Sequence, residues 1–519
     1  MTTNGHENGT HVSNHSSDHV VPLLINGKEI TNETTFDVVS PVSGKVIWKG
    51  TSVSKEQAIE AVEAAQAAFP AWSKTKPAFK RDILLRASDI LKSWGDEICE
   101  YMNNETGSVD GVSRYFNLPL GIEQLKDVAG RIVTVTGSIP VCGDEGKSAL
   151  MYKEPYGVVF GIAPWNSPIT LGVRAITYAL AAGNTCVLKG SEMSPRCFWA
   201  IGSIFKAAGL PDGVLNVIFH RTQDAPEVTS AIIEHPFVKK INFTGSTATG
   251  SIIAAQAGKL LKPVLMELGG KAPAIVLKEA NLEKAAEGCA VGAFMHSGQV
   301  CMSTERILVH SSIAEKFREA LKTAMEKIYG KESPAPILVH GPPVQKNKKL
   351  VEQALSKGAK ILAGDLNAKE HSDTRMRPIV VDGVTKDMDL YHIESFGPTV
   401  SLIVVDSEEE AIEIANDTEY GLSASVFTED LAAGLRVAKQ IETGYASPFH
   451  SFLLSADAAE WRDQSIEADD NSAVHINNMT VHDECNLPHG GAKKSGWGRF
   501  NGTAGIEEFL RIKCVTWAD

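Results

Sequence analysis

The sequence predicts an α/β protein built on two doubly wound parallel sheets. From residue 157 onward, short apolar runs of strand length alternate with longer amphipathic runs of helix length. This βαβ order is typical of parallel sheets. A second series of the same kind begins after residue 265, and the 519 residues of the chain are enough for more than one domain. Each series is therefore expected to form its own sheet.

The N-terminal part of the chain comes before this alternation. Residues 1–20 are polar, a composition that predicts a disordered tail. Short strands and turns are expected over residues 23–51. Ser54 and Gln57 form a capping box, which marks the start of a helix. The helices expected in this region cover residues 55–69 and 79–104, with further helix to 131.

The elements of the two series follow in order. In the first series, strands are expected at 157–164, 183–190, 216–220 and 239–245, and helices at 194–209, 225–236 and 246–258. In the second, strands are expected at 272–278, 306–310, 399–406, 423–429 and 473–478, and helices at 281–296, 312–328, 345–358, 407–417 and 431–444. The two series meet near Glu267. Ligands of such sheets bind beyond the carboxyl ends of the strands, so the loops that follow strands hold the candidate residues.

Charge and cysteine content exclude several kinds of partner. The formal net charge is −13, which argues against nucleic acid because phosphate binding needs a basic surface. No apolar run reaches the ~18 residues that a membrane span requires, so no membrane partner is expected. The eight cysteines form no C-x-x-C pair, so no metal site is expected. With no secretory signal, we expect a cytoplasmic protein with reduced cysteines.

Two loops of the first series have the residues of a dinucleotide site. In "FTGSTATG" a strand turns into a helix, and Gly245 and Ser246 lie where free amides can hold a phosphate; an ordinary N-capped helix is the alternative. In "LKGSEMSP" Lys189 and Glu192 follow a strand and are suited to ribose hydroxyls. An isolated surface ion pair is the alternative there.

Three further side chains are suited to acyl chemistry. Cys301 in "GQVCMSTER" is either a nucleophilic thiol or a small buried apolar residue. Glu267 in "MELGG" follows an apolar strand, and desolvation would raise its pKa toward the range of a general base; otherwise it caps a turn. Asn166 in "APWNSP" is a restricted amide, suited to an oxyanion or to a plain turn. Glu394 in "ESFGP" is a fourth candidate, or an ordinary strand entry.

The order of these motifs resembles the aldehyde dehydrogenase superfamily. The resemblance covers about residues 23–513 and rests on PWN, K-G-S-E, FTGST, ELGGK, GQ-x-C, E-x-FGP and "PHGGAKKSGWGR", with Cys301 34 positions after Glu267. The stretches "GVRAITYALAAGNTCVLKGSEMSP" and "GGKAPAIVLKEANLEKAA" look closest to the branch that includes salicylaldehyde and vanillin dehydrogenases, which oxidise aromatic aldehydes.

The resemblance implies an architecture. It consists of two doubly wound Rossmann-like domains with a β-hairpin oligomerisation arm, and the chain is expected to form a homodimer or homotetramer. The implied parts are an NAD-binding domain of residues 21–136 and 158–265, a catalytic domain of residues 266–484, and an arm of residues 137–157 and 485–519. From the sequence, residues 137–157 indicate two strands around a polar turn.

The resemblance also implies a role for each candidate. Cys301 would be the nucleophile and Glu267 the general base, while Asn166 and the Cys301 amide would form the oxyanion hole. The implied cofactor-binding residues are Trp165, Lys189, Glu192, Gly245, Ser246, Gly250, Glu394 and Phe396. NAD is the expected cofactor and NADP the second candidate, because Glu192 would repel a 2′-phosphate.

The activity implied is NAD(P)-dependent oxidation of an aldehyde, expected to be aromatic, to the carboxylic acid. The reaction would pass through a thiohemiacetal and a thioester on Cys301, and Glu267 favours hydrolysis of that thioester. Two other classes remain open. One is a thiol esterase that uses Cys301 and Glu267 without cofactor. The other is a non-catalytic protein on the same fold, which the presence of every catalytic position disfavours.

Arg174 is the one candidate for substrate selection. It lies eight residues after Asn166, so on a helix the two share a face. A buried guanidinium there would attract a phenolate or another polar ring substituent. The alternative is a structural arginine paired with an acid elsewhere in the chain.

The sequence departs from the family pattern at three places. Gly190 stands where proline is usual, and Ile393 where a second acid is common. The third departure is a 28-residue insertion at 445–472, between the helix that ends at 444 and the strand at 473–478. It is either a surface lid or untranslated sequence kept in the gene model. We expect an excursion that leaves the core intact, because loop-closure entropy rises slowly with length.

Overall fold

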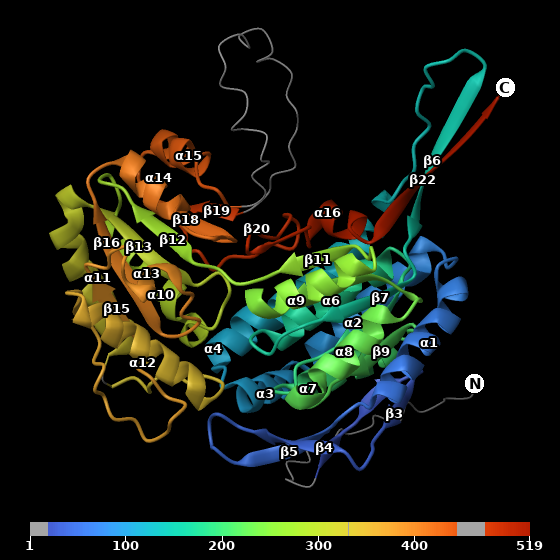
Figure 1. Cartoon of the computed structure of the whole chain (residues 1–519), viewed down its shortest axis with the longest axis horizontal. Coiled ribbons are helices and arrows are strands. Elements are labelled where there is room, and N and C mark those ends of the chain that lie inside the picture. Colours follow the sequence, from blue (N-terminus) through green and yellow to red (C-terminus); the bar gives the residue numbers. More distant parts are fainter. Residues whose placement is uncertain (1–18, 331, 444–472, 519) are drawn as a thin grey trace, which may run out of the picture.

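The computed structural model describes residues 19–330, 332–443 and 473–518. The predicted tail at 1–20 lies almost wholly outside the described residues, and the insertion at 445–472 lies wholly outside them. The described chain is α/β, and its two large sheets lie side by side (Figure 1). The α/β prediction is therefore confirmed.

The first large sheet has eight strands in the order β21-β11-β10-β7-β8-β9-β2-β3. The five central strands are parallel and correspond to the first predicted series: β7 (Val158–Ile162), β8 (Thr185–Lys189), β9 (Leu215–Ile218), β10 (Val238–Thr244) and β11 (Val264–Glu267). The other strands, all antiparallel to their neighbours, are β2 (Leu23–Ile25), β3 (Lys28–Ile30) and β21 (Gly496–Trp497). The helices of this series are α6 (Pro168–Ala181), α7 (Pro195–Ala207), α8 (Ala225–Glu234) and α9 (Thr247–Lys259).

The second large sheet has seven strands in the order β14-β15-β16-β13-β12-β18-β19. Its strands are β12 (Ala272–Val276), β13 (Thr304–His310), β14 (Lys360–Ala363), β15 (Ile379–Asp382), β16 (Thr399–Val405), β18 (Ser423–Phe427) and β19 (Ala473–Ile476). Its main helices are α10 (Leu282–Phe294), α11 (Ala314–Tyr329), α12 (Gly341–Ser356), α14 (Glu408–Asn416) and α15 (Leu431–Ala438). Apart from β14, neighbouring strands are parallel, as the alternation predicts.

The N-terminal helices confirm one prediction and correct another. The capping box at Ser54 and Gln57 is present at the start of α1 (Lys55–Trp72). The helix expected over 79–104 is two helices, α2 (Pro77–Ser93) and α3 (Gly95–Thr106), and α5 (Leu118–Arg131) follows after a further break. The second break comes at Gly107, whose φ of 72° is left-handed and ends α3. A small sheet of β1 (Val20–Val21), β4 (Thr35–Val39) and β5 (Val46–Thr51) lies nearby.

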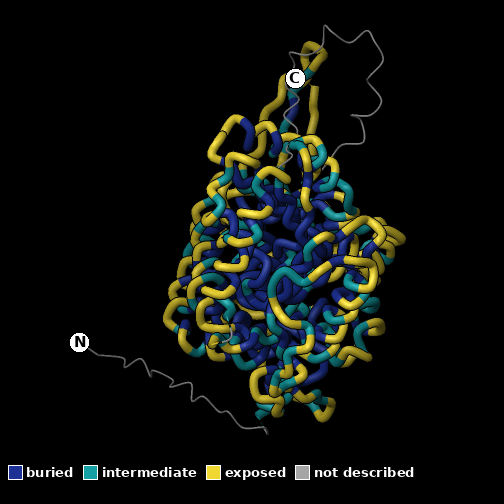
Figure 2. The backbone as a smooth tube through the Cα atoms, turned by 90° about the vertical axis from the view of Figure 1, so that its left-hand side faces the viewer, coloured by how far each residue is buried: buried dark blue, intermediate teal, exposed yellow. Residues whose placement is uncertain are grey.

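The arm differs from the hairpin expected within 137–157. β6 (Lys147–Pro155) pairs along its whole length with the C-terminal β22 (Leu510–Ala518). The first half of the expected hairpin is reduced to one bridge between Ser138 and Met151, because Pro140, Gly143 and Gly146 interrupt regular pairing. The arm projects from the molecule, with the C-terminus near its tip (Figure 1), and β22 is exposed beyond its first residue (Figure 2).

Buried apolar side chains form one core around the eight-stranded sheet and two on the seven-stranded sheet. Figure 2 shows this burial concentrated inside the body of the molecule. Within the described residues, no helix combines the length and apolar character that crossing a membrane requires.

Candidate active site

Eight of the predicted site residues converge at the carboxyl ends of the strands, where the two large sheets meet. A cavity of about 310 Å³ is lined by residues from both. Seven predicted residues and the nucleophile candidate line it: Trp165, Asn166, Gly245, Ser246, Glu267, Glu394, Phe396 and Cys301. Side chains up to 231 positions apart in the sequence are thus brought to one place, as the strand-end argument predicts.

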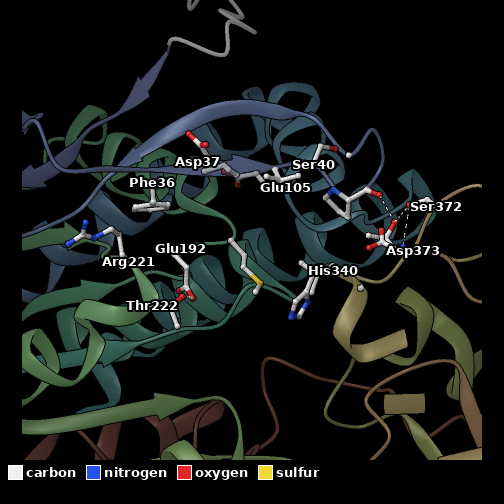
Figure 3. A pocket seen from close by; sticks show the side chains of 18 of the residues that line it. Phe36, Asp37, Ser40, Glu105, Glu192, Arg221, Thr222, His340, Ser372 and Asp373 are labelled. Carbon is white, nitrogen blue, oxygen red and sulfur yellow. Dashed lines mark hydrogen bonds between the residues drawn. The ribbon is translucent and has the colours of Figure 1, made fainter. Parts of the chain in front are cut away.

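A second cavity of about 680 Å³ adjoins the first, and His340 lines both. Glu192 and Thr222 lie on one side of it, and Ser372 and Asp373 on the other (Figure 3). The two cavities together form an extended site, long enough to separate two ends of one ligand.

The loop that holds Cys301 is strained and tightly anchored. After α10, three consecutive residues have positive φ: His296 at 48°, Ser297 at 61° and Gly298 at 74°. Gln299, which is fully buried, accepts a hydrogen bond from the Val339 amide at 2.9 Å and donates one to the His296 carbonyl at 3.1 Å. Such strain persists only where the surroundings hold it, and it clusters at functional sites.

Glycines let this loop approach the strand that bears Glu267. A Cβ atom on Gly270 would lie 2.4 Å from the Cys301 carbonyl oxygen, and one on Gly269 would lie 2.6 Å from a Glu394 oxygen. A side chain at Gly270 would collide with the backbone of the cysteine loop, and one at Gly269 would displace the Glu394 carboxylate. The two glycines of the "ELGG" motif therefore allow Cys301 and Glu394 to lie close to the strand that bears Glu267.

The thiol and Glu267 form a buried pair. Burial raises the pKa of the Cys301 thiol, and the neighbouring Glu267 carboxylate raises it further. Glu267 is 1% exposed, and neither of its oxygens has a hydrogen-bond partner within the described residues. Cys301 is therefore a thiol that faces a carboxylate able to take its proton, which is the arrangement an activated nucleophile requires.

Asn166 is placed as an oxyanion donor. It is 5% exposed, and its Nδ2 donates to the Gln299 carbonyl at 2.9 Å. A side-chain amide has two N–H groups, so one remains for a ligand in the cavity. The Cys301 backbone amide makes no hydrogen bond within the described part of the chain. Both donors adjoin the thiol, where a tetrahedral oxyanion would form.

The loop after residue 393 brings Glu394 and Phe396 into the cavity. Glu394 accepts a hydrogen bond from the Gly270 amide at 2.9 Å, and burial raises its pKa to about 7. The buried Glu305 holds the loop by accepting from the amides of Ser395 at 2.9 Å and Phe396 at 3.1 Å. Phe396, at φ 45°, meets the Trp165 ring edge-to-face at 6.0 Å.

Lys189 and Glu192 lie at the far end of the extended site. Their charged groups are 3.7 Å apart, and Thr222 donates to Glu192 at 3.0 Å. Burial lowers the pKa of Lys189. Burial also opposes ionisation of Glu192, but the Lys189 charge and the hydrogen bonds outweigh it and lower the pKa of that carboxyl. Glu192 is thus an ionised acceptor for hydroxyl donors.

The N-terminus of α9 lines the cavity that holds Cys301. Ser246 is its N-cap and accepts a hydrogen bond from the Thr249 amide. Gly245 lines the cavity beside it. Gly250 has a different role, because a Cβ there would lie 2.5 Å from the Leu268 side chain, so this glycine allows α9 to pack closely. A helix N-terminus flanked by two carboxylates fits a dinucleotide: phosphates at the helix, a ribose at each carboxylate.

Arg174 does not line the cavity that holds Cys301. It is buried on α6, where it forms an ion pair with Asp483, and its guanidinium lies over the Phe500 ring at 5.8 Å. Asp483 also accepts a hydrogen bond from Asn501 at 2.7 Å. Arg174 therefore has the acidic partner that the structural alternative requires, and its role toward substrate stays a prediction.

For three residues near the Cys301 thiol and the Glu267 carboxylate, the sequence predicts no role. Gln299 anchors the cysteine loop, although "GQ-x-C" contains it. His489 and Asp483 lie behind Glu267, and only the "PHGG" motif points to the histidine. Their importance depends on contacts between distant segments, for which the sequence has no local signal.

Comparison with known proteins places the chain in a family. The model of the family described as "Aldehyde dehydrogenase family" matches residues 29–448 and 449–515. The chain belongs to the aldehyde dehydrogenase family. It is an NAD(P)-dependent aldehyde dehydrogenase with the fold of that family. The predicted family, fold and reaction class are confirmed.

Individual relatives agree with this assignment. A vanillin dehydrogenase of Pseudomonas sp. (strain HR199 / DSM 7063) is 39% identical over 504 residues, which cover 96% of this chain and 97% of that protein. The crystal structure of a salicylaldehyde dehydrogenase from Pseudomonas putida G7, complexed with salicylaldehyde, is 33% identical with a TM-score of 0.87, covering 96% of this chain and 98% of the other. A betaine aldehyde dehydrogenase from Staphylococcus aureus in complex with NAD+ is 28% identical with a TM-score of 0.85, covering 96% and 94%.

Proposed function

We propose that this enzyme oxidises a neutral aromatic aldehyde to its carboxylic acid with NAD, using Cys301 as nucleophile and Glu267 as general base. The observation that carries the proposal is the convergence of Cys301, Glu267 and Asn166 on one cavity that continues into a site suited to a dinucleotide.

Each step follows from the side chains around the thiol. Glu267 takes the thiol proton, and the sulfur attacks the aldehyde carbon. The oxyanion that forms accepts hydrogen bonds from Asn166 and from the Cys301 amide; loss of one such donor typically costs about 3–4 kcal/mol of barrier. The bound nicotinamide supplies the hydride acceptor. Glu267 passes the thiol proton to solvent before hydrolysis. It then takes a proton from water, whose oxygen attacks the thioester carbon; as the C–S bond breaks, that proton goes to the Cys301 sulfur and the acid leaves.

A third cavity supports the aromatic class of substrate. Its volume is about 530 Å³, and Tyr115, Phe116, Met479 and Val481 line it. Phe116, Met479 and Val481 pack in the same apolar cluster as Cys301, so the cavity leads toward the thiol. Glu123, Asp127 and Glu484 also line it. The first two are ion-paired with Lys126 and Arg131, so Glu484 is the carboxylate that would repel an anionic aldehyde. The names of the vanillin and salicylaldehyde relatives point to the same class.

Glu192 favours NAD over NADP. Its pKa is lowered, so it is ionised at neutral pH and would repel a 2′-phosphate on the adenosine ribose. Ion pairing also occupies nearby cations: Lys189 with Glu192, and Arg221 with Asp224 at 2.7 Å.

The arm supports assembly into a homodimer or homotetramer. Exposed apolar side chains on it include Ile139, Val141, Ile512, Val515 and Trp517. A two-stranded ribbon is only marginally stable alone, so a second copy of the chain is the partner that best covers this surface.

The eight cysteines are all free, which fits the reducing cytoplasm.

The division into domains also remains a proposal. The core of the eight-stranded sheet supports an NAD-binding domain at 21–136 and 158–265. The cores of the seven-stranded sheet support a catalytic domain at 266–484. Pairing of β6 with β22 supports an arm made of 137–157 and 485–519.

Substitution of the two central residues tests the proposed function. Cys301→Ala should abolish aldehyde oxidation, measured as formation of reduced nicotinamide, while titration of cofactor fluorescence shows that NAD still binds. Glu267→Gln should slow turnover but allow one round of hydride transfer. Cys289→Ala is the matched control, because that cysteine is buried on α10 outside the cavity. Near-normal oxidation by the Cys301→Ala protein would contradict the assignment.

A further inference from the structure

A buried histidine lies between two carboxylates beside the thiol. His489 is 7% exposed. Its Nε2 is 3.9 Å from Glu267 Oε1, and its Nδ1 is 3.9 Å from Asp483 Oδ1. Each ring nitrogen therefore faces one buried carboxylate, and one of them is the base of the proposed reaction.

The hydrogen-bonding needs of these groups match. Within the described residues, neither Glu267 oxygen nor His489 Nε2 has a nitrogen or oxygen hydrogen-bond partner, and the Cys301 thiol is the other group that interacts with Glu267. A buried polar group without a partner typically costs about 1–3 kcal/mol. Closing the gap between Nε2 and Oε1 by about 1 Å would give a hydrogen bond of ordinary length. A single proton placed between the two atoms would satisfy both.

The far side of the ring is held in place. The His489 and Phe500 backbones exchange two hydrogen bonds of 2.8 Å, which fix the position of the histidine backbone. Asp483 is fixed in turn by its ion pair with Arg174 and by the Asn501 amide. A carboxylate at Nδ1 favours the tautomer with its proton on Nδ1, which leaves the Nε2 lone pair directed at Glu267.

The formal charges of the buried cluster do not balance. Glu267 and Asp483 are two carboxylates and Arg174 is one cation, so with a neutral ring the cluster keeps one negative charge. In a buried site, one added proton removes that charge. His475 on β19 interacts with this ring; burial, followed by the charges of His482 and His489, lowers its pKa to about 4, so it stays neutral above pH 5.

We propose that His489 is the positioning residue of the general base: it orients the Glu267 carboxyl and shares the proton that Glu267 takes from the hydrolytic water. This inference rests on the proposed function. In hydrolysis, an O–H bond of water breaks and its oxygen bonds to the thioester carbon. The proton is held between Glu267 Oε1 and His489 Nε2. When the C–S bond breaks, that proton returns to the Cys301 sulfur, and the carboxylic acid leaves.

The first test separates hydride transfer from hydrolysis in the full-length enzyme. His489→Phe keeps the ring shape and removes both nitrogens. With benzaldehyde and NAD, rapid mixing should show the first equivalent of reduced cofactor forming at close to the normal rate. Hydrolysis should slow by roughly 10–100-fold, less than the 10²–10⁴-fold that a general base itself contributes. Mass spectrometry of acid-quenched enzyme should then find the benzoyl group accumulated on Cys301.

Two further variants exclude a merely structural role. His489→Gln keeps a polar group beside Glu267 and should restore part of the hydrolysis rate; it also serves if the phenylalanine variant does not fold. In a Glu267→Gln background, His489→Phe should cause no additional loss, because the two residues act on one step. His310→Phe, on β13 away from the cavities, is the control for the same chemical change.

The outcomes are distinct. Normal hydrolysis without acyl-enzyme in His489→Phe would overturn the inference. Equal slowing of hydride transfer and hydrolysis, or additive losses with Glu267→Gln, would also overturn it, because each indicates general disruption of the site. Failure of the proposed function itself would appear differently, as no reduced cofactor from the unmodified enzyme with any aromatic aldehyde.

Discussion

Replacement of Arg174 by methionine tests whether this arginine stabilises the fold or selects the substrate. Arg174 and Asp483 form a buried ion pair with side chains 2% and 4% exposed. Arg174→Met keeps an apolar stem but leaves Asp483 without its cation. Removing one partner of a buried pair typically costs about 3–5 kcal/mol. Because Asn501 still donates to Asp483 at 2.7 Å, we expect the lower end of that range.

A second substitution completes a double-mutant cycle. Asp483→Leu in the Arg174→Met background removes the unpaired carboxylate, and apolar replacement of a buried pair is often close to neutral. Thermal unfolding at one heating rate should therefore rank Arg174→Met lowest, with the double variant recovering more than half of the loss. Lowering the pH should reduce the difference in unfolding temperature between the Arg174→Met variant and the unmodified protein. Arg174 outweighs burial and lowers the pKa of Asp483, so the pair's contribution is present at neutral pH and is lost as pH falls below the ordinary aspartate range.

Activity assays complete this test. The structural role predicts that Arg174→Met lowers kcat/KM equally for benzaldehyde and for hydroxybenzaldehydes. If the variant instead unfolds at the same temperature as the unmodified protein, and only its kcat/KM for hydroxybenzaldehydes falls, the ion-pair reasoning is wrong and Arg174 contacts the substrate.

Three further predictions concern the thiol loop, the cofactor and the arm. Gly270→Ala should lower kcat more than tenfold while the protein still folds, because its Cβ would lie 2.4 Å from the Cys301 carbonyl oxygen. Gly258→Ala is the control, since there is open space around its Cβ. Equal kcat values for the two variants would refute the steric argument. Glu192→Ser should raise kcat/KM for NADP relative to NAD, and an unchanged ratio would show that Glu192 does not face the ribose. Glutamates at both Val515 and Trp517, which share one face of β22, should reduce the assembly size in light scattering; an unchanged size would remove the arm from the interface.

Local sequence patterns were sufficient for most of the fold and for the cavity lining. Strand-end residues such as Glu267 and Gly245 meet because parallel strands end at one edge, a rule that needs no knowledge of tertiary contacts. The helix break at Trp94 was not predicted, because the amphipathic pattern continues through it. Packing against neighbouring segments decides such breaks.

The contacts behind the base depend on distant pairs. Arg174 and Asp483 are 309 positions apart, so the choice between a substrate role and an ion pair had to stay open from the sequence. The same holds for Gln299, whose anchoring partner Val339 is 40 positions away. Sequence periodicity describes which face of an element is buried, but it does not identify the partner that the face meets.

The C-terminal segment has a consequence for how the enzyme is made. Ser495 donates to the Gly269 carbonyl at 2.6 Å, Gly496 pairs with Glu267 in the sheet, and the same segment includes His489 and continues into β22. The wall behind the base is therefore synthesised after every other strand of both large sheets. A nascent chain translated only as far as residue 484 contains all strands of these sheets except β21, but it lacks this wall. We therefore expect a product truncated after residue 484 to be inactive in aldehyde oxidation, because nothing closes the site behind Glu267.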